Sequence, residues 1–382
     1  MQDVTQTAGL PNTDYYAPNF RVEIEGEELD REAHGDILEL KVVMDKDNMT
    51  SFDFTVNNWD DKTIAFKYSD KNTFDVGKHV HIMMGYADRM LSMVSGQIAT
   101  MTPRFVDGQA STLTVSGQDG MALLRDSQPG DGETIQYLQK ADWEIAQAIA
   151  ERHGLNFEAT REGEVHTEVI QRNQDDAQFL MERAKRIDFD CFIITDPESN
   201  ESTLNFVRPP DGRTAGPIRT YQFVWGESLI SFTPTISLSR QVSTVTVRGW
   251  DDRTKQAIVA TATADDLPET GSGSSGPQVV ADTMPRRQEV VVDSPVASYE
   301  EARDLAISIL RERAYEFITG VGRCIGLADL RCGDNIELQR LGRFSGTYYV
   351  KKVSHSIGGN GYLTDFEARR LFHPDQAQQG GA

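Results

Sequence analysis

Hydrophobic and polar residues alternate along the first third of the chain. Apolar side chains recur at every second position, as at Phe20, Val22 and Ile24, in five runs at residues 20–29, 36–45, 50–59, 78–86 and 111–119. Because successive side chains of a strand point to opposite faces, this period predicts antiparallel strands with one buried face. Short strands at this spacing, separated by Gly, Asn and Asp, indicate a β-barrel or a β-sandwich.

The period changes to that of helices between residues 126 and 215. We expect a helix at 140–154, capped by Asp142 and ended by Gly154, and a second at 173–190, capped by Asn173. A buried strand at 191–195 and its partner at 202–209 follow, so this part is predicted to be a small α/β insert. The inward positions of the two helices are Ile145, Ala146, Ile149, Ala150, Ala177, Leu180, Met181 and Ala184.

Strand patterns return at residues 220–262 and again at 318–370. Between them lies a polar stretch rich in Gly and Ser at 265–280, which predicts a flexible linker. A helix is expected at 298–317, where Ser298 and Glu301 form a capping box. Its apolar stripe consists of Ala302, Leu305, Ala306, Ile309 and Leu310.

Two strand-rich segments resemble each other. Residues 74–119 and 330–370 both have a glycine before an alternating strand, Gly77 and Gly333, and both then reach a Ser-Gly pair. From the second residue of that pair to a leucine in the last strand is 17 residues in each case, Gly96 to Leu113 and Gly346 to Leu363. The shared spacing predicts two related β-barrels.

The expected fold class is therefore mainly β with an α+β insert. It has two related tube-like β-barrel domains, a small α/β domain and a connector that bears a helix. The expected divisions are a flexible N-terminal segment at 1–14, a first barrel at 15–125, the insert at 126–215, a second barrel at 216–264 and 318–372, the linker and connector helix at 265–317, and a disordered tail at 373–382.

The net charge of the chain disfavours two classes of function. The 382-residue chain has a net charge of −21, which disfavours nucleic-acid binding and binding to anionic membranes, since both require Lys and Arg against phosphates. We attribute the acidity to solubility. The N-terminus has no signal-peptide pattern and no apolar run is long enough to span a membrane, so we expect folding in the bacterial cytoplasm.

The three cysteines, Cys191, Cys324 and Cys332, are too few for a disulfide framework and form no CxxC pair. His79 and His81 share a strand face, but no third metal ligand is placed near them, so a polar strand face is favoured over a metal site. The DKDN stretch at 45–48 begins like a calcium loop, but Met49 takes a ligand position, and we interpret it as a turn. The LPETG letters at 267–271 are interpreted as linker.

No motif assigns a catalytic residue. Glu144, Glu151, Glu182 and Asp188 are most simply explained as solvated helix faces. His355 lies in a strand whose alternation would put Tyr349, Lys351 and Val353 on its face, with Tyr348, Val350, Lys352 and Ser354 opposite. It has no nucleophile or carboxylate partner fixed by a motif, so we expect a packed strand residue. No catalytic, cofactor-binding or metal-binding residue is therefore predicted, and no cofactor.

The stretch 330–370, with 243–251 and 142–155, resembles the phage late control gene D family. These are baseplate hub proteins of contractile phage tails, related to the hub half of the type VI secretion spike protein VgrG and to hubs of contractile injection systems. The resemblance covers residues 15–372. Its strongest parts are Gly333-Asp334, residues 346–350, His355, residues 361–364 with Phe366, and residues 247–251.

This resemblance implies a homotrimeric structural protein, not an enzyme, with two tube-like barrels per subunit around a central channel. It would be a symmetry adaptor that joins the hexameric inner tube to the trimeric spike of a virion or injection particle. The implied partners are an inner tube or tube-initiator protein, a separate spike protein and other baseplate proteins, with no specific nucleic-acid binding and no membrane insertion. The alternatives are a baseplate-associated cell-wall hydrolase and a receptor-binding β-protein, for which Tyr15-Tyr16 and Tyr348-Tyr349 are the aromatic candidates.

Overall fold

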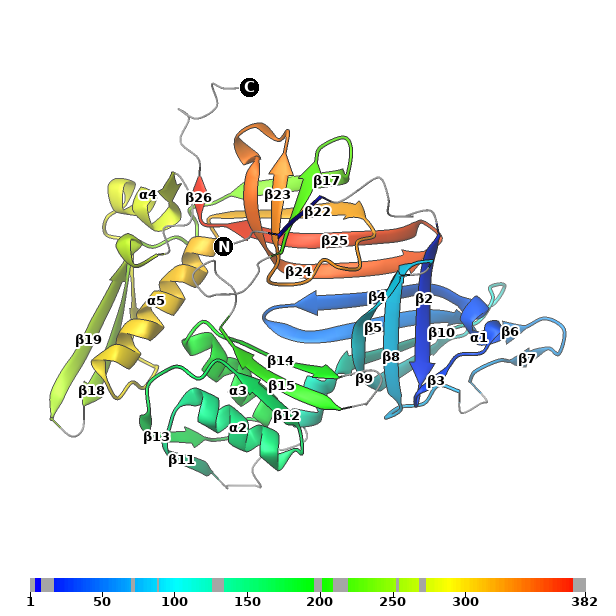
Figure 1. The fold of residues 1–382 in the computed structure, drawn as a ribbon, viewed down its shortest axis with the longest axis horizontal. Helices are drawn as coiled ribbons and strands as arrows, with labels where there is room; N and C mark the ends of the chain where they lie inside the picture. The colour runs from blue at the N-terminus through cyan, green and yellow to red at the C-terminus, as the bar shows by residue number, and fades with distance from the viewer. Residues whose placement is uncertain are drawn as a thin grey trace.

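The computed structural model describes residues 4–7, 17–69, 73–87, 89–125, 134–195, 201–208, 219–251, 254–267 and 273–373. These residues form two related sheets, a small α/β unit and a three-stranded sheet covered by a helix, each around its own hydrophobic core (Figure 1). The expected fold class, mainly β with an α+β insert, is confirmed. No described helix is long and apolar enough to cross a membrane.

The first sheet follows the alternating runs of the sequence. Its strands lie in the order β4-β5-β10-β9-β8-β2, and their buried side chains form one core, which includes Phe52, Phe54 and Ile82. The strands are β2 (Pro18–Ile24), β4 (Ile37–Asp45), β5 (Asn48–Asn57), β8 (His79–Tyr86), β9 (Arg89–Arg104) and β10 (Thr112–Asp119). Shorter elements are β3 (Glu27–Glu28), α1 (Arg31–Asp36), β6 (Trp59–Asp60), β7 (Ala65–Phe66) and the 3₁₀ turn η1 (Gly120–Leu124).

The second sheet has the order β17-β22-β25-β24-β23-β16. Its strands are β16 (Arg219–Val224), β17 (Leu229–Ile236), β22 (Ile318–Ile325), β23 (Asn335–Gln339), β24 (Gly346–Gly358) and β25 (Gly361–Arg370). A further strand, β1 (Val4–Thr7), pairs in parallel with β16. The segment 1–14 was expected to be flexible, but backbone hydrogen bonds to an edge strand order these four residues, which no periodic pattern marks.

The two sheets are built alike. Apart from β2 and β16, which come first along the chain, each sheet has five long strands. Their order across the sheet is equivalent, β4-β5-β10-β9-β8 in the first and β17-β22-β25-β24-β23 in the second, and every neighbouring pair is antiparallel. A bulge leaves Ala99 unpaired in β9, and a bulge leaves Lys351 unpaired in β24. The sixth strands differ, because β2 is antiparallel to β8 while β16 is parallel to β23. The predicted relation between the two halves is confirmed.

The Ser-Gly pairs that suggested the repeat do not occupy equivalent positions in the strand pairing of the two sheets. Gly96 lies opposite Val80, whereas Gly346 lies opposite Leu338. The residue equivalent to Val80, counted from Gly77 and Gly333, is Ile336, which lies opposite Tyr348. The Ser-Gly pairs are therefore displaced by two residues, which keeps the same strand face.

The sheets are continuous with each other through β24. Residues 346–349 of this strand pair with β23, and residues 352–357 pair along β4 of the first sheet. The other edge of β24 pairs with β25. One long strand thereby joins both sheets by backbone hydrogen bonds, which fixes their relative position (Figure 1).

The α/β unit contains β11 (Ile135–Lys140), α2 (Asp142–Arg152), β12 (Asn156–Ala159), β13 (His166–Gln171), α3 (Asp176–Arg186), β14 (Asp190–Thr195) and β15 (Ser202–Val207). Both predicted caps are wrong. Asp142 is already helical, and its carboxylate contacts His166 and Arg183 within the unit, while Ala141 occupies the cap position. Asp175, not Asn173, caps α3 by accepting a hydrogen bond from the Gln178 N–H at 2.7 Å.

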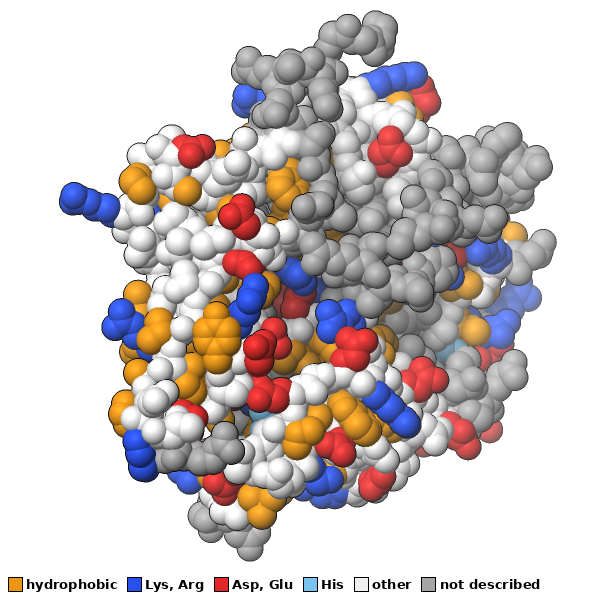
Figure 2. Space-filling view, turned by 60° about the vertical axis from the view of Figure 1, so that its left-hand side comes forward, with side chains coloured by type: hydrophobic (Ala, Val, Ile, Leu, Met, Phe, Trp, Pro, Cys, Tyr) orange, Lys and Arg blue, Asp and Glu red, His pale blue; other side chains and the backbone are white. Residues whose placement is uncertain are grey.

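The fourth unit differs from the expected second barrel. β18 (Thr244–Asp251), β19 (Gln256–Thr263) and β21 (Gln288–Val291) form a separate three-stranded sheet under α5 (Tyr299–Tyr315). Val245 and Val247 pack on the helix stripe instead of entering the barrel core. The outer face of this sheet exposes Trp250, Val259 and Val290. Figure 2 shows hydrophobic side chains among charged ones at the end of the molecule that contains this unit.

Part of the expected linker is ordered. The 3₁₀ turn η2 (Ala264–Asp266), β20 (Ser274–Ser275) and α4 (Gly276–Thr283) lie within it, and β20 pairs with β26 (Phe372–His373). Ser275 caps α4, whose first turn contains Pro277 and whose Val280 is buried. Residues 268–271 of the LPETG stretch, the Tyr15-Tyr16 pair and the tail from 374 lie outside the described residues.

Candidate functional site at the junction of the sheets

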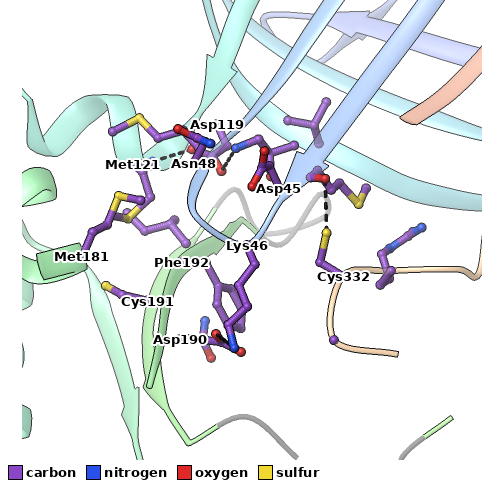
Figure 3. Close-up of a pocket in the computed structure, with 18 of the residues that line it drawn as sticks. Asp45, Lys46, Asn48, Asp119, Met121, Met181, Asp190, Cys191, Phe192 and Cys332 are labelled. Carbon is purple, nitrogen blue, oxygen red and sulfur yellow. Dashed lines mark hydrogen bonds and ion pairs between the residues drawn. The ribbon is translucent and has the colours of Figure 1, made fainter. Parts of the chain in front are cut away.

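A cavity of about 730 Å³ opens where the two sheets meet the α/β unit (Figure 3). Its walls come from the β4–β5 hairpin, β9, η1, α3, β14 and the loop before β23. No single stretch of sequence supplies it, so strand pairing and the docking of the α/β unit bring its residues together. Cavities of this size between structural units are where proteins commonly bind other molecules.

The β4–β5 turn reaches into this junction. Asp45 pairs with Asn48 across the hairpin, which confirms the turn expected at 45–48. From its tip, the Lys46 ammonium lies 3.1 Å from the Asp190 carboxylate of β14 and 5.3 Å from the centre of the Tyr349 ring. Burial alone would lower the pKa of Lys46, but the neighbouring Tyr349 and Asp190 raise it, so the amine stays charged.

The other carboxylates of the turn are engaged by the second sheet. Asp47 lies 2.8 Å from the Lys351 ammonium, and Asp45 lies 3.6 Å from that of Lys352. Lys351 is the bulged residue of β24 and Lys352 follows it, so the turn is held where the two sheets join. The carboxylates thus bind side-chain cations of the chain itself, and no group of three or more His, Cys, Asp or Glu suited to a metal ion occurs among the residues that the structure describes.

Asp119 is a buried acid beside the cavity. Its carboxylate accepts hydrogen bonds from the Thr50 N–H at 3.0 Å and from the Met121 N–H at 3.1 Å. Burial raises the pKa of Asp119 to about 6, although both hydrogen bonds favour the charged form. The side chain ties β5 to the start of η1 and so positions Met121 on the cavity wall.

Two thiols line the cavity, and both are unreactive. The Cys332 thiol donates to the Met44 carbonyl at 3.2 Å. Burial raises the pKa of Cys191 and that of Cys332 to about 12. The thiolate is the nucleophilic form, so neither side chain is prepared for covalent catalysis near neutral pH.

A buried hydroxyl lies at the cavity wall beside the Lys46 ammonium. The Tyr349 hydroxyl is buried and makes no hydrogen bond of ordinary geometry with the described residues, and burial raises its pKa to about 12. Buried polar atoms are rarely left without a partner, so such a group at a cavity wall indicates a place where another molecule can bind.

Both ring nitrogens of His355 are hydrogen-bonded inside the core. Its ring is fully buried, with Nε2 3.1 Å from the Leu330 carbonyl and Nδ1 3.1 Å from the hydroxyls of Tyr362 and Thr364. A carbonyl only accepts, so Nε2 carries the proton and Nδ1 accepts from the hydroxyls. Burial, together with the charge of Arg331, lowers the pKa of His355 to about 3. This histidine is a neutral cross-link within the second sheet.

The predicted faces of β24 are partly wrong. Tyr348 and Val350 point into the core, and so do Val353 and His355. The bulge at Lys351 adds one residue to the strand and reverses the alternation beyond it. Val350 and Val353 therefore share a face although they are three residues apart.

The HxH pair lies on β8 and is not part of the cavity lining, although its hydroxyl partners Ser92 and Ser95 are. The His81 ring contacts the Glu23 carboxylate at 3.1 Å and the Ser92 hydroxyl at 3.0 Å, and the His79 Nε2 lies 3.0 Å from the Ser95 hydroxyl. The neighbours of these rings are thus a carboxylate and two hydroxyls of adjacent strands.

The acidic residues of the α/β unit have mostly local roles. Glu144 accepts from the Ala141 N–H, Glu151 from Gln147 and Glu182 from Gln174. Asp188 follows α3 and forms an ion pair with Arg311 of α5, so it is not a solvated helix position. No local pattern indicates this contact, because the two residues are far apart along the chain.

The sequence matches the family described as Alg8 N-terminal domain over residues 15–359, and the chain therefore belongs to that family. No curated protein is similar enough in sequence to count as a match.

Solved structures with the same fold come from phage tails and a secretion system. A tail protein of prophage MuSo2 from Shewanella oneidensis has 14% identity and a TM-score of 0.67, over 93% of this chain and 98% of that one. A tail protein from Neisseria meningitidis has 12% identity and a TM-score of 0.67, over 94% and 99%. An E. coli component of the type VI secretion system has 15% identity and a TM-score of 0.55, over 92% and 80%. At these identities the likeness establishes a shared fold.

Proposed function

We propose that this member of the Alg8 N-terminal domain family is a structural baseplate hub of a contractile phage tail or contractile injection system. It would act as a homotrimer of pseudo-six-fold symmetry that joins the hexameric inner tube to the trimeric spike around a central channel. The observation that carries this proposal is the duplicated sheet, with five strands in the same order and a bulge at the same place in each copy.

The duplication suits a symmetry adaptor. Three chains with two equivalent sheets present six similar surfaces, which a six-fold ring can contact, while the rest of each chain remains three-fold. The β24–β4 pairing supports this use, because it fixes the distance and angle between the two copies within one chain.

The uncovered face of the joined sheets fits a channel wall. Across β9, β10, β5, β4 and β24 one row of paired residues consists of Thr100, Ser116, Asp53, Lys41 and Ser356. None of these side chains is buried, and all are hydrophilic. We propose that this face lines the channel, where a hydrated surface on a chain of net charge −21 would let cargo pass without holding it.

Assembly is the first test. Light scattering of the purified chain mixed with the spike and tube proteins encoded beside it should give a complex that contains three copies, and cryo-electron microscopy of that complex should show six similar sheets around a channel. A chain that stays monomeric with both partners present would refute the hub.

The channel wall is tested separately. Asp53→Lys combined with Glu367→Lys on β25 should leave the three-copy complex intact and slow cargo delivery, because the reversed charges would attract acidic cargo. Delivery at the unaltered rate would contradict the assignment of this face.

A structural rather than an enzymatic role is part of the proposal. The neutral, enclosed His355 and the unreactive cavity thiols support it. A zymogram against peptidoglycan tests the alternative of a cell-wall hydrolase, and clearing by the purified chain would overturn the structural assignment.

A further inference from the structure

The junction cavity gathers methionines. The chain has eleven methionines, and five of them, Met44, Met49, Met93, Met121 and Met181, line this one cavity. They come from β4, β5, β9, η1 and α3. Figure 3 shows Met121 and Met181 approaching from the side of the α/β unit, opposite the strands of the first sheet.

Methionine is suited to binding side chains of varied shape. Its unbranched thioether has three rotatable bonds and adapts to its neighbours, and for this reason methionines are frequent on surfaces that bind partner segments. Met49 and Met181 are only partly buried, so their side chains are accessible from the cavity. The remaining lining includes apolar Val94 and Ile193. This wall is complementary to an aliphatic side chain.

The charged residues of the cavity lining favour a ligand that has a basic side chain next to the aliphatic one. Four carboxylates of the lining, those of Asp45, Asp119, Glu158 and Asp190, face the cations of Lys46 and Arg331, and Lys352 outside the lining pairs with Asp45, which leaves one negative charge in excess. Asp45, Asp119 and Asp190 are engaged by Lys352, backbone N–H groups and Lys46. Glu158 on β12 is exposed and has no ion pair among the residues that the structure describes.

A polar acceptor lies within the same cavity. The Tyr349 hydroxyl, buried and without a hydrogen bond to the described residues, can accept from an ammonium or from a peptide N–H. The cavity therefore combines an adaptable apolar wall, a carboxylate without an ion pair among the described residues and a buried hydroxyl beside Lys46.

We propose that this cavity is a docking site for a segment of another baseplate polypeptide that places an aliphatic residue beside a Lys or Arg. The aliphatic side chain would pack among the methionines while the cation meets Glu158. This inference rests on the proposed hub function, because a hub has protein neighbours close to its junctions. Charge complementarity selects this occupant over an acidic segment or an uncharged small molecule.

A defined peptide tests the site on the full-length chain. The probe is the acetylated and amidated peptide Gly-Ser-Leu-Lys-Met-Leu-Lys-Ser-Gly, and its control has Glu at both Lys positions. With ¹³C-labelled methionine methyl groups, the probe should shift the signals of the five cavity methionines and leave those of Met84, in the first core, and of exposed Met284 unchanged. The control peptide should bind at least about tenfold more weakly than the probe.

Matched variants locate the binding. Met181→Gln should weaken binding of the probe about tenfold, because it puts a polar amide among the thioethers, whereas Met284→Gln should have no effect. Glu158→Gln should weaken the Lys peptide and reduce its advantage over the Glu peptide.

The outcomes separate this site from the hub itself. Absence of shifts at millimolar probe, shifts outside the cavity, equal binding of both peptides, or probe binding unaffected by Met181→Gln would each overturn the docking site. Light scattering of the same variants with the spike and tube proteins reports on assembly, so a hub that assembles but does not bind the probe refutes only this inference.

Discussion

Ile98 and Val350 make the same pair of backbone hydrogen bonds in two different sheets. The Ile98 carbonyl accepts from Gly77 at 2.8 Å and its N–H donates to Lys78 at 2.9 Å. The Val350 carbonyl accepts from Gly333 at 3.0 Å and its N–H donates to Asp334 at 2.9 Å. The bulged residue follows directly in each strand, so the two sites are equivalent.

This equivalence predicts equal costs for two glycine substitutions. Gly77 and Gly333 have φ angles of +84° and +91°, and an added Cβ would meet no atom closer than 3.8 Å at either site. Gly77→Ala and Gly333→Ala should each lower the free energy of unfolding by about 1 kcal/mol through backbone strain alone. Urea unfolding measures both.

Gly35→Ala is the matched control, because Gly35 lies in α1 with a negative φ and open space around its Cα. It should leave stability unchanged or raise it slightly. A loss at only one of the two equivalent glycines would contradict their equivalence.

His355→Phe should destabilise the chain by about 3 kcal/mol or more. The Leu330 carbonyl and the Tyr362 hydroxyl lose their partner inside the core, and the phenyl ring is larger than the fully buried imidazole that it replaces. His79→Phe, at a half-buried site with one hydroxyl contact, should cost about 1 kcal/mol or less. Equal losses in denaturant unfolding would contradict the cross-linking role.

His355 also predicts a pH dependence. Its pKa is about 3 in the folded chain and near 6.5 when exposed, so its contribution to stability is present above pH 6.5 and is lost as the pH falls toward 3. The difference in unfolding free energy between the natural chain and His355→Phe should therefore shrink between pH 7 and pH 5. A constant difference would show that the histidine is not neutral.

Asp119 should act in the opposite direction. Its pKa of about 6 lies above the ordinary value of 3.8, so the folded chain gains stability as the pH falls through 6, by up to about 3 kcal/mol. Asp119→Asn removes the titration, although it also gives up one of two hydrogen-bond acceptors. Unfolding free energies from pH 7 to pH 4.5 should rise less for Asp119→Asn than for the natural chain, and parallel profiles would exclude a perturbed Asp119.

The Lys46–Asp190 pair should show strong coupling. Lys46→Met leaves a carboxylate largely enclosed without its cation and should cost about 3 kcal/mol. The double variant Lys46→Met with Asp190→Leu removes both charges and should recover most of that loss. A double-mutant cycle by urea unfolding gives the coupling, and additive losses would show that the two charges stabilise the chain independently.

Alternation in the sequence determined the strands of both sheets, because one covered face imposes a period of two on each run. Similar glycine positions also indicated that the two halves are related. The helix cap was found for a local reason as well, since the Ser298 hydroxyl accepts from the Glu301 N–H at 3.0 Å within one helical turn. The expected capping box forms only in part, because the Glu301 carboxylate accepts from the Ala297 N–H and not from that of Ser298.

Tertiary structure decided what local pattern does not encode. The bulge at Lys351 reversed the faces of β24, and packing on α5 drew β18 and β19 out of the expected barrel. The cavity is the clearest case: its five methionines, Asp190 and Tyr349 lie on elements far apart in the chain. Only the docking of the α/β unit against the joined sheets brings them together, because contacts between distant residues depend on how whole elements pack.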